Sequence, residues 1–275
     1  KCEFFETAID DITNYLIQIL IEKNKTQIKV ISAEIIIRFA QYFDLKFSLF
    51  LKDVTYAMFL ASCDVQEDIC ETNEYPFTDD SIFFLCSIFG KKTTFPSIII
   101  ELSKEFSKSD DWKERRVAYA AIEKLIACCE YAIETYLNDL YLFIINSCRD
   151  PNPICRVFSF EALKQFCFYS FFISDKVEEI INLIISVIQN EVYDKAQNVE
   201  IKALNEFCKN CNPMSLVLHS SNLINSLLGL IDDLRYNQKI QVIQSIALLS
   251  ISTNIDLSNI YYKLIDVLRQ CFSIN

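Results

Sequence analysis

The sequence predicts an all-α solenoid, a superhelix of antiparallel helix pairs stacked side by side, and three observations support it. Apolar residues recur at intervals of three and four along most of the 275 residues, which is the helical period. Glycine and proline, which sheet proteins need at their turns, number only two and five. Similar helical segments recur about every 41 residues, so one structural unit is repeated along the chain.

The composition excludes several classes of protein. With 52% apolar residues the chain is too apolar to be disordered, and its formal charge of -11 disfavours nucleic acid and anionic membranes and favours a basic partner. No apolar run approaches the roughly 20 residues that span a bilayer, and the N-terminus lacks a signal-peptide pattern. We expect a soluble, intracellular protein. Because residue 1 is Lys rather than Met, we also expect a piece of a longer protein.

Individual helices are indicated by amphipathic segments. AIDDITNYLIQILI (8–21) and KVEEIINLIISVI (176–188) both carry apolar residues at helical spacing. Their many isoleucines favour strands by intrinsic propensity, but the length and period of the segments outweigh that weak preference. We therefore expect helices throughout.

The repeat is marked by a five-residue pattern of a small residue, an aliphatic residue and, at the fifth position, a large apolar one. Three copies follow at separations of 41, a fourth comes one residue late, and two earlier copies precede them by 40 and then 46 residues. The extra length of the earliest interval, 46 residues, predicts a loop insertion between these two copies. In chain order the copies are Ile35–Phe39, Ser81–Leu85, Ala121–Leu125, Ala162–Phe166, Ala203–Phe207 and Ser245–Leu249.

A second amphipathic segment lies between successive copies, for example at 134–148 and 220–232, so each unit is a helical hairpin. A period near 40 with two helices per unit is typical of HEAT repeats. One hairpin cannot bury both of its faces, so the hairpins must stack into a continuous HEAT-repeat α-solenoid. The predicted hairpins are 1–43, 44–91, 92–130, 131–171, 172–212 and 213–254, followed by a final helix in 255–275.

The segment Asp150-Pro-Asn-Pro predicts the start of the second helix of its hairpin. We expect the Asp150 carboxylate to cap the helix and Pro151 to occupy its first position, where a missing N–H costs nothing. Arg156 lies on the same helical stripe as Leu163, so we expect its side chain to point toward the neighbouring hairpin.

A column of basic residues at the position of Arg156, seven residues before the aliphatic marker, predicts a ladder that ties adjacent hairpins together. Tyr75 and Gln197 interrupt the column, while Asp233 and Lys239 repeat the six-residue spacing of Asp150 and Arg156. We favour a purely structural, bracing role for these charges. The predicted ladder residues are Lys29, Arg115, Asp150, Arg156, Asp233 and Lys239.

No residue constellation suggests catalysis. The single histidine, His219, has no triad context, and the two glycines, Gly90 and Gly229, stand too far apart for a phosphate loop. Paired carboxylates such as Asp10-Asp11 and Asp232-Asp233 are explained by solvation or capping. We therefore expect no enzyme, no catalytic residue and no cofactor.

The twelve cysteines are expected to be buried, reduced thiols rather than disulfides or zinc ligands. Most of them lie on the apolar stripes of helical segments, where a free cysteine packs as a small apolar residue. The one CxxC motif, Cys208-Lys-Asn-Cys211, has no second pair or ligand histidine nearby. We expect no metal site.

The segment 64–80 is rich in acidic residues and contains no Lys or Arg. We expect a loop between the two helices of one hairpin, and its simplest role is that of a solvated linker. The alternative is an electrostatic landing site for a basic partner, which screening limits to about 8 Å. Its acidic residues are Asp64, Glu67, Asp68, Glu71, Glu74, Asp79 and Asp80.

The ordered series of these motifs resembles the karyopherin-β family of nuclear transport receptors. It begins with Asp111-Trp-Lys-Glu-Arg115, AYAAIEKLIACC (118–129), Asp150-Pro-Asn-Pro, Arg156 and ALKQF (162–166). It continues through KALNEFCKNCNPMSLV (202–217) and IQVIQSIALLS (240–250), and upstream through Gly90-Lys-Lys and ISAEIIIRF (31–39). The resemblance covers nearly the whole chain, although each motif alone is a general HEAT feature.

The resemblance implies a receptor that shuttles between cytoplasm and nucleus through nuclear pores. It implies basic cargo proteins with lysine-rich localisation signals, Ran in its GTP form, and phenylalanine-glycine (FG) nucleoporins as partners, and neither a membrane nor direct contact with nucleic acid. In the family, second helices hold cargo and Ran and first helices offer grooves to nucleoporins. A HEAT scaffold or adaptor without a transport role is the alternative.

If the resemblance holds, polar residues on the exposed side of the second helices are the candidate cargo and Ran contacts. Carboxylates there would pair with lysines of the cargo, and amides would bind its extended backbone. Trp112, at the start of a second helix, is expected to wedge between hairpins rather than to stack on a ligand. The candidate contacts are Glu123, Lys124, Glu161, Lys164, Gln165, Glu200, Asn205 and Glu206.

Overall fold

The computed structural model describes residues 2–22, 25–64, 77–91 and 94–272, and in these ranges the chain forms helices, turns and no strand. The predicted all-α fold is confirmed. By its internal packing the chain divides into two units, Lys1–Phe143 and Ile144–Asn275, and each is described separately.

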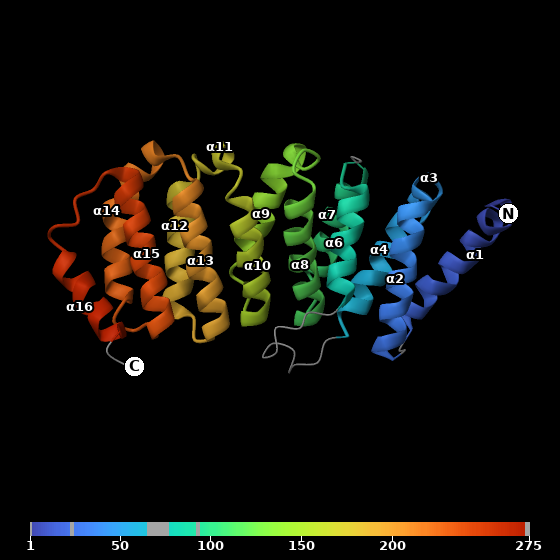
Figure 1. Cartoon of the computed structure of the whole chain (residues 1–275), viewed down its shortest axis with the longest axis horizontal. Coiled ribbons are helices and arrows are strands. Elements are labelled where there is room, and N and C mark those ends of the chain that lie inside the picture. The colour runs from blue at the N-terminus through green and yellow to red at the C-terminus, as the bar shows by residue number, and fades with distance from the viewer. Residues whose placement is uncertain (1, 23–24, 65–76, 92–93, 273–275) are drawn as a thin grey trace. The chain divides into compact units, whose positions relative to one another are not determined.

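The first unit is built from helix pairs (Figure 1). Helix α1 packs on α2 and α4, α4 packs on α6 and α7, and α7 packs on α8, while α6 also contacts α2 and α8. Helices α2, α6 and α8, the second helices of their hairpins, thus form one row. The bounds are α1 (Cys2–Ile21), α2 (Thr26–Tyr42), α3 (Asp44–Phe47), η1 (Ser48–Phe50), α4 (Leu51–Ser62), α6 (Phe77–Phe89), α7 (Thr94–Phe106), α8 (Trp112–Cys128) and η2 (Glu134–Tyr136).

The second unit repeats this arrangement. Its second helices α10, α13 and α15 pack in a row, its first helices α12 and α14 pack on each other, and α12 also packs on α13 and α14 on α15 (Figure 1). Helix α9 (Leu137–Ser147) crosses the boundary between the units. The other bounds are α10 (Pro153–Phe166), α11 (Ser170–Ile173), α12 (Val177–Asn190), α13 (Asp194–Asn210), α14 (Pro213–Leu230), α15 (Tyr236–Thr253) and α16 (Tyr261–Phe272).

The aliphatic residue of the sequence marker has the same place in each second helix of this unit. Leu163, Leu204 and Ile246 are fully buried, and each lies ten residues beyond the first residue of its helix, Pro153, Asp194 or Tyr236. The small residue before each marker is also buried, which lets the backbones of neighbouring second helices come close. The 41-residue interval is therefore the register of helix packing. These small residues are Ala162, Ala203 and Ser245.

The cap of α10 differs from the prediction, which placed Asp150 at the cap and Pro151 at the first helical position. Asn152 is the N-cap: its Oδ1 accepts from the backbone N–H groups of Ile154, at 2.8 Å, and Cys155, at 3.4 Å. Pro153 is the first helical residue, because the second proline is the one whose missing N–H falls in the first turn. The Asp150 Oδ1 accepts instead from the N–H of Asn152 and folds the preceding loop.

The predicted acidic loop, residues 64–80, ends earlier than expected, because its last residues belong to a helix. Asp79 and Asp80 lie in the first turn of α6, which begins at Phe77. Acidic residues are stabilised in this position because the N-terminus of a helix carries partial positive charge. Glu67, Asp68, Glu71 and Glu74 lie outside the described residues, as does Tyr75.

The cysteines between Cys63 and Cys271 whose side chains the structure describes are free thiols, and all of these except Cys63 and Cys128 are buried. Burial raises the pKa of the Cys208 thiol well above its ordinary value and that of Cys211 to about 11, so both are neutral at physiological pH. Within the described ranges no group of three potential metal-ligating side chains occurs. Within the same ranges, no helix is both long enough and apolar enough to cross a membrane.

Overpacking the contact between second helices tests the register. Replacing Ala203 with Leu is expected to lower the free energy of unfolding by about 1–3 kcal/mol, because added methylenes in a filled contact force backbone shifts. Chemical denaturation monitored by circular dichroism measures the change. Lys202→Leu, on the exposed side of the same helix, is the control and should change stability by less than about 0.5 kcal/mol. Equal effects of the two substitutions would contradict the assigned packing.

Candidate functional site

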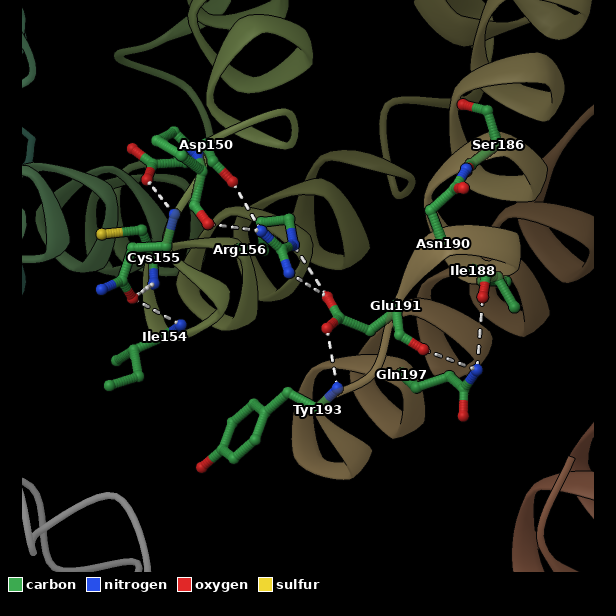
Figure 2. A network of polar contacts seen from close by, with 12 residues as sticks. Asp150, Ile154, Cys155, Arg156, Ser186, Ile188, Asn190, Glu191, Tyr193 and Gln197 are labelled. Carbon is green, nitrogen blue, oxygen red and sulfur yellow. Dashed lines mark hydrogen bonds and ion pairs between the residues drawn. The ribbon is translucent and has the colours of Figure 1, made fainter.

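Arg156 joins two consecutive hairpins of the second unit (Figure 2). Its Nη1 donates to the backbone carbonyl oxygens of Asp150, at 2.7 Å, and Pro151, at 3.1 Å, in the loop before its own helix. Its Nε and Nη2 lie 2.8 and 2.6 Å from Oε2 of Glu191, which immediately follows α12. The predicted orientation of Arg156 toward the neighbouring hairpin is therefore confirmed.

The same hydrogen bond to the loop recurs at intervals of 41 residues. Arg115 Nη1 donates to the carbonyl oxygens of Ser109 and Asp110, each at 3.0 Å. Gln197 Nε2 lies 3.2 Å from the carbonyl oxygen of Ile188 and 3.5 Å from that of Glu191. Gln197 therefore continues the column that it was predicted to interrupt, because the position requires an N–H donor and not a positive charge.

Lys239 shows a related contact with a shifted partner. Its Nζ lies 3.4 Å from the backbone carbonyl oxygen of Asp232, seven residues earlier, whereas Arg156 contacts the carbonyl oxygen six residues earlier. The one-residue delay of the last sequence marker accounts for the shift. The Asp232 carboxylate lies 3.4 Å from Lys263 on α16.

Lys29 forms the corresponding ion pair in the first unit. Its buried Nζ lies 2.5 Å from Oδ2 of Asp64, which is 35 residues later, and Arg156 and Glu191 have the same separation. Asp64 thus belongs to the ladder and not only to the acidic segment. The sequence placed Lys29 in the ladder but offered no signal for its partner.

Glu200 lies on α13 next to the Arg156–Glu191 pair, and its side chain is fully buried. Burial, and then the neighbouring Glu191 carboxylate, raise the pKa of Glu200 to about 9, which the Arg156 guanidinium only partly offsets. In the described part of the chain neither Glu200 oxygen has a hydrogen-bond donor. The neutral acid is therefore the stable form, and it can donate its proton to Glu191. This burial contradicts the expectation that Glu200 lies on the exposed face.

A groove of about 720 Å³ crosses the exposed sides of α10, α13 and α15. Four of the predicted contacts, Lys164, Gln165, Asn205 and Glu206, line it together. Sequence reasoning missed the remaining lining residues, although four of them lie 41 or 42 residues after a predicted contact or after one another: Lys202, Gln244, Ala247 and Leu248. The full lining is Lys164, Gln165, Phe168, Lys202, Asn205, Glu206, Gln244, Ala247, Leu248 and Ile251.

The groove has a polar and an apolar end. Lys202 and Gln244 lie at the middle of α13 and α15. Ile251 lies near the C-terminal end of α15 and Phe168 lies two residues beyond the end of α10, and these two side chains are 80% and 60% exposed. Between them, the Asn205 Oδ1 accepts a hydrogen bond of 2.5 Å from the Ser245 hydroxyl. The groove therefore offers charge, amides and apolar surface in sequence along the helices.

Most charges at the groove are already paired. Lys164 forms an ion pair with Glu161 one turn earlier on α10. Glu206 lies 3.6 Å from Lys209 Nζ and accepts from the Asn210 side chain at 3.2 Å. The lining contains two lysines and one glutamate, so in this region the second-helix face is not acidic as the net charge had suggested.

The remaining predicted contacts lie elsewhere. Glu123 and Lys124 belong to α8 in the first unit and form an ion pair of 2.8 Å. Trp112 begins α8 after the N-cap Asp111, whose carboxylate accepts from the N–H of Lys113, and the Lys113 ammonium lies 5.9 Å from the centre of the Trp112 ring.

A second, smaller groove of about 380 Å³ lies between the first helices α12 and α14. Its apolar lining residues are Ile181, Ile185 and Leu223, and its polar ones include His219 and Asn222. The single histidine thus lies in a surface groove between two first helices.

Comparison with solved structures identifies the fold. The karyopherin Kap121p bound to RanGTP superposes with a TM-score of 0.84 at 16% sequence identity, over 97% of this chain and 28% of that one. Kap121p bound to the extreme C-terminus of the protein phosphatase Cdc14p gives 0.84 at 17% identity, over 99% and 29%. This chain shares its fold with the karyopherin Kap121p.

Kap121p bound to Nup53p is similarly close, with a TM-score of 0.82 at 17% identity over 98% of this chain and 28% of that one. The chain therefore spans less than a third of the length of these karyopherins. No protein-family model matches the sequence. The confirmed architecture is a HEAT-repeat helical array like that of the karyopherin Kap121p.

Removing one partner of the buried ion pair tests the ladder. Glu191→Ala is expected to lower the free energy of unfolding by about 3–5 kcal/mol, because it leaves the Arg156 guanidinium without its anion and the Tyr193 N–H, which donates to Glu191 at 2.9 Å, without its acceptor. Denaturant titration measures the loss. The control is Asp139→Ala, which breaks the exposed Lys104–Asp139 pair and should cost about 0–1 kcal/mol. Similar losses in both variants would show that Arg156–Glu191 is an ordinary surface contact.

The raised pKa of Glu200 predicts a pH dependence of stability. The folded protein holds a proton that the unfolded chain releases above its ordinary pKa of 4.5, so stability contributed by Glu200 falls as the pH rises toward about 9. The slope reaches about 1.4 kcal/mol per pH unit. Glu200→Gln keeps the size and the donor but cannot ionise, so the difference in unfolding free energy between wild type and variant should follow this curve. A pH-independent difference would show that Glu200 is ionised when folded.

Proposed function

We propose that this chain is part of a nuclear transport receptor and that the groove across α10, α13 and α15 binds an extended segment of its cargo. One observation carries the proposal: four contact residues predicted from the repeat register line one groove, on a fold shared with Kap121p, a karyopherin solved with the C-terminus of Cdc14p and with Nup53p. The order of the sequence motifs supports a receptor similar to importin-5 in its central HEAT repeats.

The proposed cargo is basic. The charge of -11 attracts a lysine-rich localisation signal, and Glu206 presents a carboxylate within the groove. Gln165, Asn205 and Gln244 are suited to bind an extended peptide, because a side-chain amide both donates to and accepts from a peptide backbone. Glu123 and Lys124 of α8 in the first unit, which form an ion pair with each other, are proposed as separate cargo or Ran contacts.

Ran in its GTP form and FG nucleoporins complete the proposal. Kap121p bound to RanGTP shares the fold, which supports Ran-regulated release of cargo from overlapping contacts on the second helices. For nucleoporins we propose the groove between α12 and α14, where Ile181, Ile185 and Leu223 provide an apolar floor. Such a receptor shuttles between cytoplasm and nucleus through the nuclear pore.

Blocking the groove tests the proposed function. Ala247 lies exposed in the lining of the groove, so Ala247→Trp fills the space without disturbing the buried face of α15. We expect this variant to lose at least about tenfold in affinity for a fluorescent lysine-rich peptide, a loss of about 1.4 kcal/mol, measured by anisotropy. Ser221→Trp, on the exposed surface of α14, is the matched control and should bind normally.

Pull-downs with GTP-loaded Ran and with FG peptides separate a transport receptor from a HEAT scaffold. A receptor is expected to retain both, and Ile185→Asp in the α12–α14 groove should weaken FG binding alone. Undiminished peptide binding by Ala247→Trp would refute the groove assignment. The absence of both Ran and FG binding would favour the scaffold.

A further inference from the structure

We propose that Lys202 determines specificity in the groove, so that the bound segment is not uniformly basic but carries one carboxylate opposite Lys202 and one bulky apolar side chain at the Phe168–Ile251 end. This inference rests on the proposed function, because it concerns the same groove. It adds a partner chemistry that the net charge of the chain does not suggest.

Among the charged residues that line the groove, Lys202 differs from the others in its pairing. Lys164 is paired with Glu161, and Glu206 with Lys209. For the exposed Lys202 no ion pair occurs within the described part of the chain. A segment that carries only lysines would bring like charge against this ammonium, whereas a carboxylate would complement it.

The opposite end of the groove selects an apolar group. Phe168 and Ile251 are 60% and 80% exposed, and Leu248 lies between them and the centre of the groove. Burying a bulky side chain against this surface contributes by the hydrophobic effect, at about 25 cal/mol per Å² of apolar surface removed from water. The two ends therefore select different side chains.

The repeat register gives the distance between the two ends. Phe168 corresponds, 41 residues later, to Lys209, which is seven residues beyond Lys202 on α13. At about 1.5 Å per residue of helix this separation is about 10 Å. An extended peptide advances about 3.3 Å per residue, so in a peptide that runs parallel to the helices the acidic and the apolar side chains are about three residues apart.

The amides in the middle of the groove fit such an extended segment. The Asn205 Oδ1 is already occupied by the Ser245 hydroxyl, which orients the Asn205 NH₂ group as a donor to the peptide carbonyls. Gln165 and Gln244 lie on the two flanking helices. Recognition thus combines a sequence-independent hold on the backbone with two selective side-chain contacts.

Matched peptides test the inference. The probes are two fluorescent peptides with the same lysine-containing background and a Leu, followed three residues later by Asp in one and by Lys in the other. Wild type is expected to prefer the Asp peptide by about fivefold, as an exposed ion pair permits. Lys202→Glu should reverse the preference, and Lys202→Gln should abolish it.

The control variant is Lys195→Gln, which removes the same charge from the same helix outside the groove lining, leaves the Lys209–Glu206 pair intact and should retain the preference. Equal affinities of the two peptides for wild type, or an unchanged preference in Lys202→Glu, would overturn the inference. If Ala247→Trp still abolishes binding of both peptides in that case, the groove remains the cargo site and only the role of Lys202 fails. If neither peptide binds wild type, or both bind Ala247→Trp normally, the proposed function fails as well.

Discussion

The close packing of consecutive second helices is the constraint from which the candidate site follows. A single hairpin leaves one face of its second helix uncovered, and the neighbouring hairpin buries it at the small residues Ala162, Ala203 and Ser245. The aliphatic residue after each of them is fixed at one depth. Because one residue advances a helix by about 100°, the residues one and two positions after the aliphatic residue face away from the buried contact and line the groove.

The ladder holds the same register by different means. Arg156 reaches back to the loop before its own helix and forward to Glu191, and Glu200 must keep its proton to remain buried beside them. Taking such groups out of water costs about as much as their attraction returns, so they contribute less to stability than to the choice of one register over another. A helix displaced by one turn could still bury apolar residues. The same displacement would separate Arg156 from the loop carbonyls and from Glu191, so the network opposes it.

Features that depend on the spacing of residues along the chain were predictable from the sequence. Features that depend on contacts between segments distant in sequence were not. The helices and the depth of Leu163, Leu204 and Ile246 follow from spacing alone. The cap at Asn152, the donor role of Gln197 and the burial of Glu200 do not, because each depends on where a loop carbonyl or a second helix lies. Four groove residues were predictable by stepping around the helix; the exposure of Phe168 and Ile251 was not, since apolar residues are assigned to the core by default.

Net charge and local charge act at different stages of binding, which reconciles the acidic chain with a groove that contains two lysines. The overall charge of -11 acts on an approaching segment only within the screening distance of about 8 Å, where it accelerates encounter with a basic partner. Once the segment lies in the groove, contacts within a few ångströms decide which residue is retained. There Lys164 and Glu206 are already neutralised by Glu161 and Lys209, so the ammonium of Lys202 sets the local preference. A peptide that satisfies both the long-range attraction and the local contact with Lys202 is basic along its length and carries one acidic residue.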